Sequence, residues 1–140
     1  MTKKIPVTKG TGTGNTQLSA FDAALFDAGI ANYNLIHLSS IVPEGFEPVV
    51  EKVNLNGGAE QFGYRLYVVI AEHRQGERGK QTWAGLGWVM TKSETKKGLF
   101  VEHIGESKEE VVDQSKPVGY DQIPKGGLGR DTVGSGWPQM

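Results

Sequence analysis

Apolar residues recur at helical spacing near the start of the chain, between residues 15 and 30. In the stretch NTQLSAFDAALFDAGI, four residues share one helical face and are predicted to form its buried stripe: Leu18, Phe21, Leu25 and Ala28. Asn15 or Thr16 can cap the start of this helix, and Gly29 stands where a left-handed residue commonly ends one.

The pattern then changes to alternation, which indicates strands. Asn34, Ile36 and Leu38 share one face of YNLIHL (33–38), so the amide of Asn34 is expected to point inward and to need partners. Further strands are expected at 49–53, 62–73, 81–90 and 98–105, with 62–73 and 81–90 joined as a hairpin. A second helix is expected after Ser107, with Glu110 completing a capping box. This order predicts an α+β domain in which helices cover a largely antiparallel sheet.

Composition narrows the classes of function. The 140 residues suit one domain, and a net charge of −1 favours neither nucleic-acid nor membrane binding. The absence of cysteine excludes disulfides and cysteine-based zinc sites, and His37, His73 and His103 are too scattered for a metal motif. Without an apolar run of about 20 residues or a signal sequence, a soluble cytoplasmic protein is expected. Residues 117–140, rich in Gly and Pro, are expected to form an irregular tail.

The stretch GTGTGN (10–15) precedes the first helix, where glycine amides can bind phosphate. However, neither the Lys-Ser/Thr pair of a P-loop nor a convincing preceding strand accompanies it. A flexible entry loop is therefore the favoured interpretation.

Two carboxylates stand in unexpected places. Asp22 lies about 40° from Leu18 around the first helix, so it is at the wet margin of the stripe or at a site. Glu102 shares a strand face with Phe100 and Ile104. Burial of that face would raise the pKa of the Glu102 carboxyl and suit it to general-acid catalysis. The pattern alone does not decide whether that face is buried or faces solvent.

Ser39 and Ser40 follow the strand of residues 33–38, where two serines can simply form a turn. No G-x-S-x-G surrounds either of them, so a hydrolase elbow is not indicated. Another chemistry is open to such a pair. The Ser40 hydroxyl can attack the Ser39 carbonyl in an N-to-O acyl shift, and β-elimination then leaves a pyruvoyl group at position 40.

Two stretches, LSAFDAALFDAGIANYNLIHLSSIVP (Leu18–Pro43) and GLFVEHIGE (Gly98–Glu106), resemble the pyruvoyl-dependent arginine decarboxylases of archaea and some bacteria. The resemblance implies an αββα four-layer sandwich with mainly antiparallel sheets. It also implies cleavage of the single domain between Ser39 and Ser40, which gives a β chain of residues 1–39 and an α chain of residues 40–140. The pyruvoyl group derived from Ser40 would be the cofactor, with no PLP and no metal.

The resemblance also implies roles for individual residues. Glu102 matches the catalytic acid, Asn34 the asparagine that assists processing or orients the site, and Asp22 the ligand of the substrate guanidinium. Leu25, Ala31 and Tyr33 match positions that line the substrate pocket. Arginine would form a Schiff base with the pyruvoyl group, lose CO2 and leave as agmatine, for polyamine synthesis or acid consumption. The assembly implied is a homotrimer of αβ units, or a higher multiple, with sites at the interfaces.

Tyr33 replaces a small aliphatic residue of the best-known archaeal members, and Ala31 replaces a glycine, so the pocket is expected to be narrower. Two alternatives stay open. One is decarboxylation of another amino acid, such as histidine, although Asp22 favours a cationic side chain. The other is an unprocessed homologue that acts as a binding or assembly protein.

Overall fold

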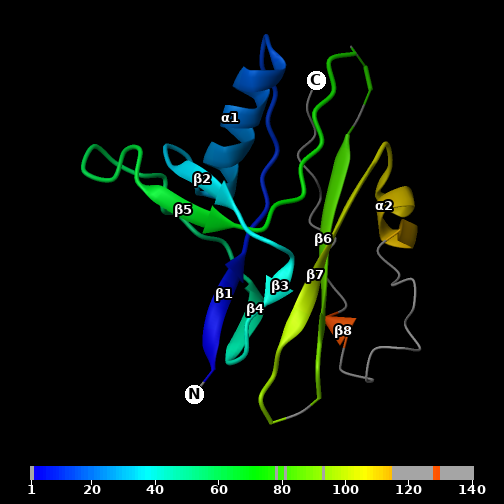
Figure 1. Ribbon diagram of the computed structural model, residues 1–140. Helices are drawn as coiled ribbons and strands as arrows, with labels where there is room; N and C mark the ends of the chain where they lie inside the picture. The colour runs from blue at the N-terminus through cyan, green and yellow to red at the C-terminus, as the bar shows by residue number, and fades with distance from the viewer. Residues whose placement is uncertain (1, 78, 81, 93, 115–127, 130–140) are drawn as a thin grey trace.

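A computed structural model describes residues 2–77, 79–80, 82–92, 94–114 and 128–129. Its elements follow in the order β1 (Lys3–Val7), α1 (Gln17–Ala28), β2 (Asn34–His37), β3 (Ile41–Val42), β4 (Phe46–Val50), β5 (Arg65–Val68), β6 (Trp83–Met90), β7 (Gly98–Gly105), α2 (Lys108–Gln114) and β8 (Leu128–Gly129). The two helices lie on opposite sides of the molecule with strands between them (Figure 1). The predicted α+β class is confirmed.

The largest sheet is antiparallel, with strand order β3-β7-β6-β8. Strands β6 and β7 form a hairpin that is paired over all eight residues, from Trp83 opposite Gly105 to Met90 opposite Gly98. The other two sheets are parallel pairs, β1 with β4 and β2 with β5. The antiparallel prediction therefore holds for the largest sheet and fails for the two small ones.

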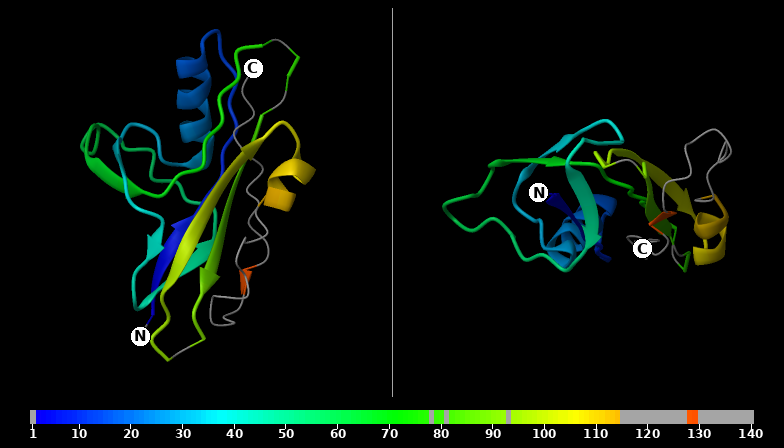
Figure 2. Two further views of the ribbon diagram at one scale, coloured as in Figure 1. Left: turned by 45° about the vertical axis from the view of Figure 1, so that its right-hand side comes forward. Right: turned by 90° about the horizontal axis from the view of Figure 1, so that it is seen from below.

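The predicted hairpin between residues 62–73 and 81–90 is wrong. Strand β5 covers only Arg65–Val68 and pairs in parallel with β2. The chain after β5 follows α1 instead of turning back, because Ile70 and Ala71 pack into the core cluster around that helix. Gly76 lies against the side chain of Gln17, at the start of α1. In the left view of Figure 2, the chain after β5 rises alongside α1.

Helix α1 begins and ends where the sequence predicts. The Thr16 hydroxyl accepts from the Ser19 amide at 3.0 Å, the Ser19 side chain caps Thr16 in return, and Gly29 is left-handed at φ 82°. The buried face, however, consists of Ala20, Ala24, Leu25 and Ala28. Leu18, predicted to belong to the buried stripe, is 63% exposed.

The alanine face is buried by residues 8–14, which we call the glycine strap. A Cβ on Gly10 would lie 2.1 Å from the Ala24 carbonyl oxygen, and one on Gly12 would lie 2.2 Å from that of Ala20. The Thr8 hydroxyl donates to the Ala28 carbonyl at 2.8 Å. The expected flexible loop is instead packed against α1, and its glycines allow two backbones to touch.

Two apolar clusters make up the core. The first joins α1 to Ala31, Ala71 and Ala84. The second joins β1, β3, β6 and β7 through five buried side chains: Val7, Val42, Trp88, Met90 and Phe100. Val42 is fully buried there, which anchors the short strand β3 against β7.

The tail predicted at 117–140 lies outside the described residues, apart from Leu128–Gly129, which pairs with β6 as β8. Within the described part of the chain, neither helix is long and apolar enough to cross a membrane.

Candidate active site

Ser40 and Glu102 meet where β3 pairs with β7. Ile41 lies opposite Leu99 and Val42 opposite Gly98. The Phe100 amide donates to the Ser40 carbonyl at 2.9 Å, which extends the pairing by one residue. The Ser40 hydroxyl donates a hydrogen bond to Glu102 Oε1. Two groups 62 residues apart in sequence are thus in direct contact, as a nucleophile and its base must be.

The surroundings of Glu102 differ from those that a buried face would give. Phe100 is buried on the inner side of β7, whereas Glu102, two residues later on the same face, is exposed. Strand β3 pairs with Gly98 and Leu99 at the start of β7, and it lies beside that strand rather than over the face that carries Glu102. The contact of Glu102 with Ser40 comes from sheet geometry, and burial within one chain contributes little to it.

The Ser39–Ser40 peptide lies where the chain passes from the β2–β5 pair to the antiparallel sheet (Figure 1). On one side, the Leu38 amide donates to the Val68 carbonyl at 2.8 Å. On the other side, the Ile41 amide donates to the Ser39 carbonyl at 2.7 Å. Both neighbours of the serine pair are therefore held by backbone hydrogen bonds.

Asn34 begins β2 and is exposed, so the predicted inward orientation is wrong. Its side-chain amide donates to the Gly63 carbonyl at 2.6 Å, and its backbone amide donates to Tyr64 at 2.8 Å. Because a strand rises about 3.3 Å per residue, the length of β2 separates Asn34 from Ser40. Asn34 is thus bound to the loop before β5, at the opposite end of β2 from the serines.

The loop of residues 54–63 binds the segment that carries Ala31 and Tyr33. The Ala31 amide donates to the Asn56 side chain at 2.9 Å, and the Tyr33 hydroxyl donates to the Gln61 side chain at 2.6 Å. Gly57 leaves room for the Tyr33 ring, because a Cβ there would lie 3.2 Å from it. No motif in the sequence points to Gln61, and the paired glycines 57 and 58 are the one signal that could mark this loop.

Asp22 is exposed on α1. At four-residue spacing it stands between Leu18 and Phe26, which are 63% and 64% exposed. Leu25 points elsewhere, because it is buried in the core cluster around α1. Asp22 therefore belongs to an exposed helix face with large apolar neighbours.

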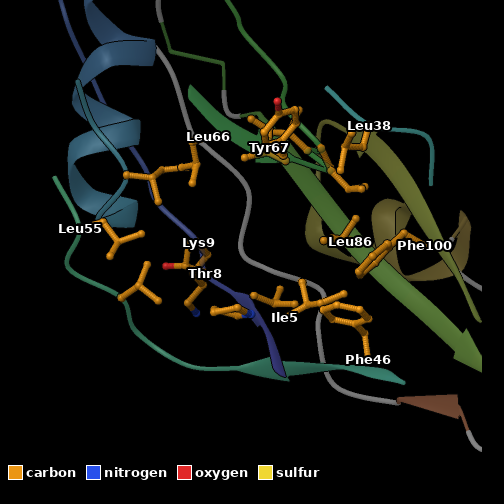
Figure 3. Close-up of a pocket in the computed structure, with 18 of the residues that line it drawn as sticks. Ile5, Thr8, Lys9, Leu38, Phe46, Leu55, Leu66, Tyr67, Leu86 and Phe100 are labelled. Carbon is orange, nitrogen blue, oxygen red and sulfur yellow. The ribbon is translucent and has the colours of Figure 1, made fainter. Parts of the chain in front are cut away.

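A cavity of about 480 Å³ lies between the two core clusters. Figure 3 shows Leu86 and Phe100, from β6 and β7, and Ile5 and Phe46, from β1 and β4, along its walls. Polar groups on its wall come from Thr8, Lys9 and Tyr67, and the remaining wall is apolar. None of the carboxylates considered above lines it, so it does not suit a charged amino acid.

Comparison with known proteins assigns the family. The sequence profile of the pyruvoyl-dependent arginine decarboxylase family matches residues 4–122. The chain belongs to this family. The pyruvoyl-dependent arginine decarboxylase of Thermoplasma volcanium is 37% identical over 98 residues, which cover 69% of this chain and 52% of that protein.

Two further members of the pyruvoyl-dependent arginine decarboxylase family illustrate the range. Pyruvoyl-dependent arginine decarboxylase 2 of Archaeoglobus fulgidus is 28% identical over 121 residues, covering 86% of this chain and 76% of its own length. The Methanopyrus kandleri member is 56% identical over 45 residues, covering 32% of this chain and 30% of its own length. The chain spans about half the length of the Thermoplasma relative, and about three quarters of that of the Archaeoglobus relative.

Proposed function

We propose that this chain is a self-processing, pyruvoyl-dependent decarboxylase that converts L-arginine to agmatine and CO2. The observation that carries the proposal is the contact between the Ser40 hydroxyl and the Glu102 carboxylate. Self-processing needs a hydroxyl directly after the scissile carbonyl and a base that touches it, and these two residues supply both. The family's name and those of the relatives above support the same reaction.

The proposed processing begins when Glu102 takes the proton of the Ser40 hydroxyl. The oxygen bonds to the Ser39 carbonyl carbon, the Ser39–Ser40 C–N bond breaks, and the proton passes to the released Ser40 nitrogen. Loss of the Ser40 α-proton then breaks the Cβ–O bond and frees Ser39 as a carboxylate. The dehydroalanine left at position 40 takes up water and releases ammonia, which leaves the pyruvoyl group. The products are chains of residues 1–39 and 40–140.

The pyruvoyl group, once formed, supplies an electron sink for the electrons left when CO2 departs. The chain's own residues bind the substrate and move protons. Glu102, already beside position 40, is the proposed proton donor to the product carbon. Asp22 is the proposed ligand of the guanidinium, because a carboxylate binds this planar cation through two parallel hydrogen bonds. Tyr33, fixed by Gln61, and Ala31 would limit the length of the side chain that fits.

The proposed assembly completes the site between chains, as a homotrimer of αβ units with an αββα sandwich in each. Asp22 lies on an exposed helix face beside Leu18 and Phe26, which supports coverage of that face by another chain. Asn34, at the far end of β2 from Ser40, would then serve a neighbouring site. As the sequence leads us to expect, we propose that this assembly is located in the cytoplasm.

Intact-mass measurement of purified protein tests the proposal directly. The expected result is two chains, of 39 and 101 residues, with borohydride and arginine adding mass to the larger one alone. Arginine, ornithine, lysine and histidine are then assayed side by side for CO2 release. A single 140-residue species after long incubation would favour an unprocessed binding protein. Cleavage with CO2 released from histidine and none from arginine would instead assign another substrate.

A further inference from the structure

The Ser39 carbonyl takes part in a three-residue turn. The Ile41 amide, two residues further along, donates to the Ser39 carbonyl at 2.7 Å. This bond defines a γ-turn with Ser40 at its centre. Among the described non-glycine residues only Asn32 has a positive φ, so Ser40 adopts the inverse form that is common at strand ends.

The register of β3 explains why the Ile41 amide is free to make this bond. The Phe100 amide donates to the Ser40 carbonyl, so positions 40 and 100 form a hydrogen-bonded pair. Ile41 and Leu99 are then a non-hydrogen-bonded pair, in which neither amide points at the partner strand. Since β3 is the edge strand of its sheet, the Ile41 amide points outward and reaches the Ser39 carbonyl.

From this geometry we infer that the Ile41 amide is the oxyanion donor of the self-cleavage at Ser39. This inference rests on the processing proposed above. As the Ser40 oxygen bonds to the Ser39 carbonyl carbon, an electron pair moves onto the Ser39 oxygen, where the Ile41 N–H stabilises it. The pair returns as the C–N bond breaks, and the Ser40 nitrogen receives the proton held by Glu102. No oxidant or other reactant is required for this step.

Three functions of an acyl-transfer site therefore lie within a few residues. The Ser40 hydroxyl is the nucleophile, Glu102 is the base that touches it, and the Ile41 amide already lies on the oxygen that becomes negative. Removal of one oxyanion donor typically slows such reactions about 10²–10³-fold. The serine pair lies directly before an edge strand, and this position leaves the Ile41 amide free to reach the Ser39 carbonyl.

Replacement of the Ile41 amide by an ester tests the inference, because it removes the N–H and keeps the side chain. Cleavage is monitored by intact mass, and it is expected to be about a hundredfold slower than in the wild type. The same replacement at Phe100 is the control. It removes a neighbouring backbone bond, to the Ser40 carbonyl, and should slow cleavage far less.

A genetic pair gives an independent test. Ile41→Pro removes the N–H without removing a bond between strands, because this amide points outward from an edge strand. Ile41→Ala keeps the N–H and truncates a side chain that is already 59% exposed. Proline should slow cleavage at least about a hundredfold, and alanine should leave it within a few-fold of the wild type. Thermal unfolding of each variant establishes that it is folded.

Cleavage of the folded ester and proline chains at the wild-type rate would overturn the role of Ile41 and leave the proposed processing intact. A wild-type chain that never cleaves would overturn the proposed processing itself. If the Phe100 ester slows cleavage as much as the Ile41 ester, the effect is one of strand pairing, and the oxyanion role is wrong.

Discussion

At the scale of single residues, the contact between Ser40 and Glu102 has a consequence for the order of events. The carboxylate touches the hydroxyl in the uncleaved chain, before any pyruvoyl group exists. A group placed there can act first as the base of processing and later as the proton donor of decarboxylation. The two proposed reactions would then depend on one side chain.

We expect Glu102→Gln to slow self-cleavage by about 10²–10⁴-fold, because an amide cannot take the Ser40 proton. The measurement is the time course of the 39- and 101-residue fragments by mass. Glu106→Gln, which changes an exposed glutamate just after β7, should cleave at the wild-type rate. Cleavage of the Glu102 variant at the wild-type rate would show that Glu102 is not the base of processing.

Asp22→Asn should lower kcat/KM for arginine about tenfold to a hundredfold and leave cleavage intact. The neutral amide loses the charge-assisted hydrogen bonds to the guanidinium. Asp27→Asn is the matched control on the same helix, since the Asp27 carboxylate accepts from the Thr11 amide at 2.9 Å. Equal losses in the two variants would point to damage to α1 rather than to a substrate contact.

The residues of the candidate site also show what the sequence could and could not predict. The resemblance singled out Ser40 and Glu102, which the structure brings into contact. The inward orientation expected of Asn34 does not occur in the single chain, where that residue is exposed. The pattern left burial or exposure of Glu102 open, and the structure has it exposed. Alternation along a strand reveals which residues share a face but not what covers that face. Tyr33 was singled out, but its partner Gln61 was not, because that contact is 28 residues distant.

At the scale of elements, the glycine strap shows how a short motif can be mistaken for a binding loop. Its alternate glycines face Ala20, Ala24 and Ala28, so the repeat GTGTG matches the small-residue face of the helix. Helix α1 and its two caps were predictable because capping is local in sequence. The partners of β2 and β5 were not, because parallel pairing depends on the path of the intervening chain.

We expect Gly12→Ala to destabilise the protein by about 1–3 kcal/mol, measured by urea unfolding. The added Cβ would lie 2.2 Å from the Ala20 carbonyl oxygen and 2.4 Å from the Ala24 nitrogen, so the strap must move away from α1. Thr13→Ala, at the adjacent exposed position of the same strap, should change stability by less than about 0.5 kcal/mol. Equal stability of the two variants would mean that the strap is not packed as described.

At the scale of the whole molecule, many large apolar side chains are exposed in the single chain. They include Phe26, Phe62, Tyr64 and Tyr67, each more than half exposed. They occur on α1, on β5 and on the loop before β5, the parts that also carry Asp22 and bind Asn34. This distribution supports the proposal that the site is completed between chains.

Mixing an inactive chain with an impaired one tests that arrangement. Ser40→Ala cannot form the pyruvoyl group, and Asp22→Asn is expected to bind arginine poorly, but each variant keeps the residue that the other lacks. Random exchange in a cyclic assembly would make about a quarter of the sites wild type. CO2 release above the sum of the separate variants is therefore expected. Strict additivity after confirmed subunit exchange would place both groups in one chain.

Cleavage after Ser39 would place the two strands of each parallel pair on different polypeptides. Strands β1 and β2 then belong to the short fragment, and β4 and β5 to the long one. Five residue pairs of β1–β4 and four of β2–β5 become contacts between separate polypeptides. Helix α1, on the short fragment, remains packed against Ala71 and Ala84 of the long one. Maturation would thus turn one fold into an obligate two-chain complex, whose small piece cannot leave without unfolding the whole.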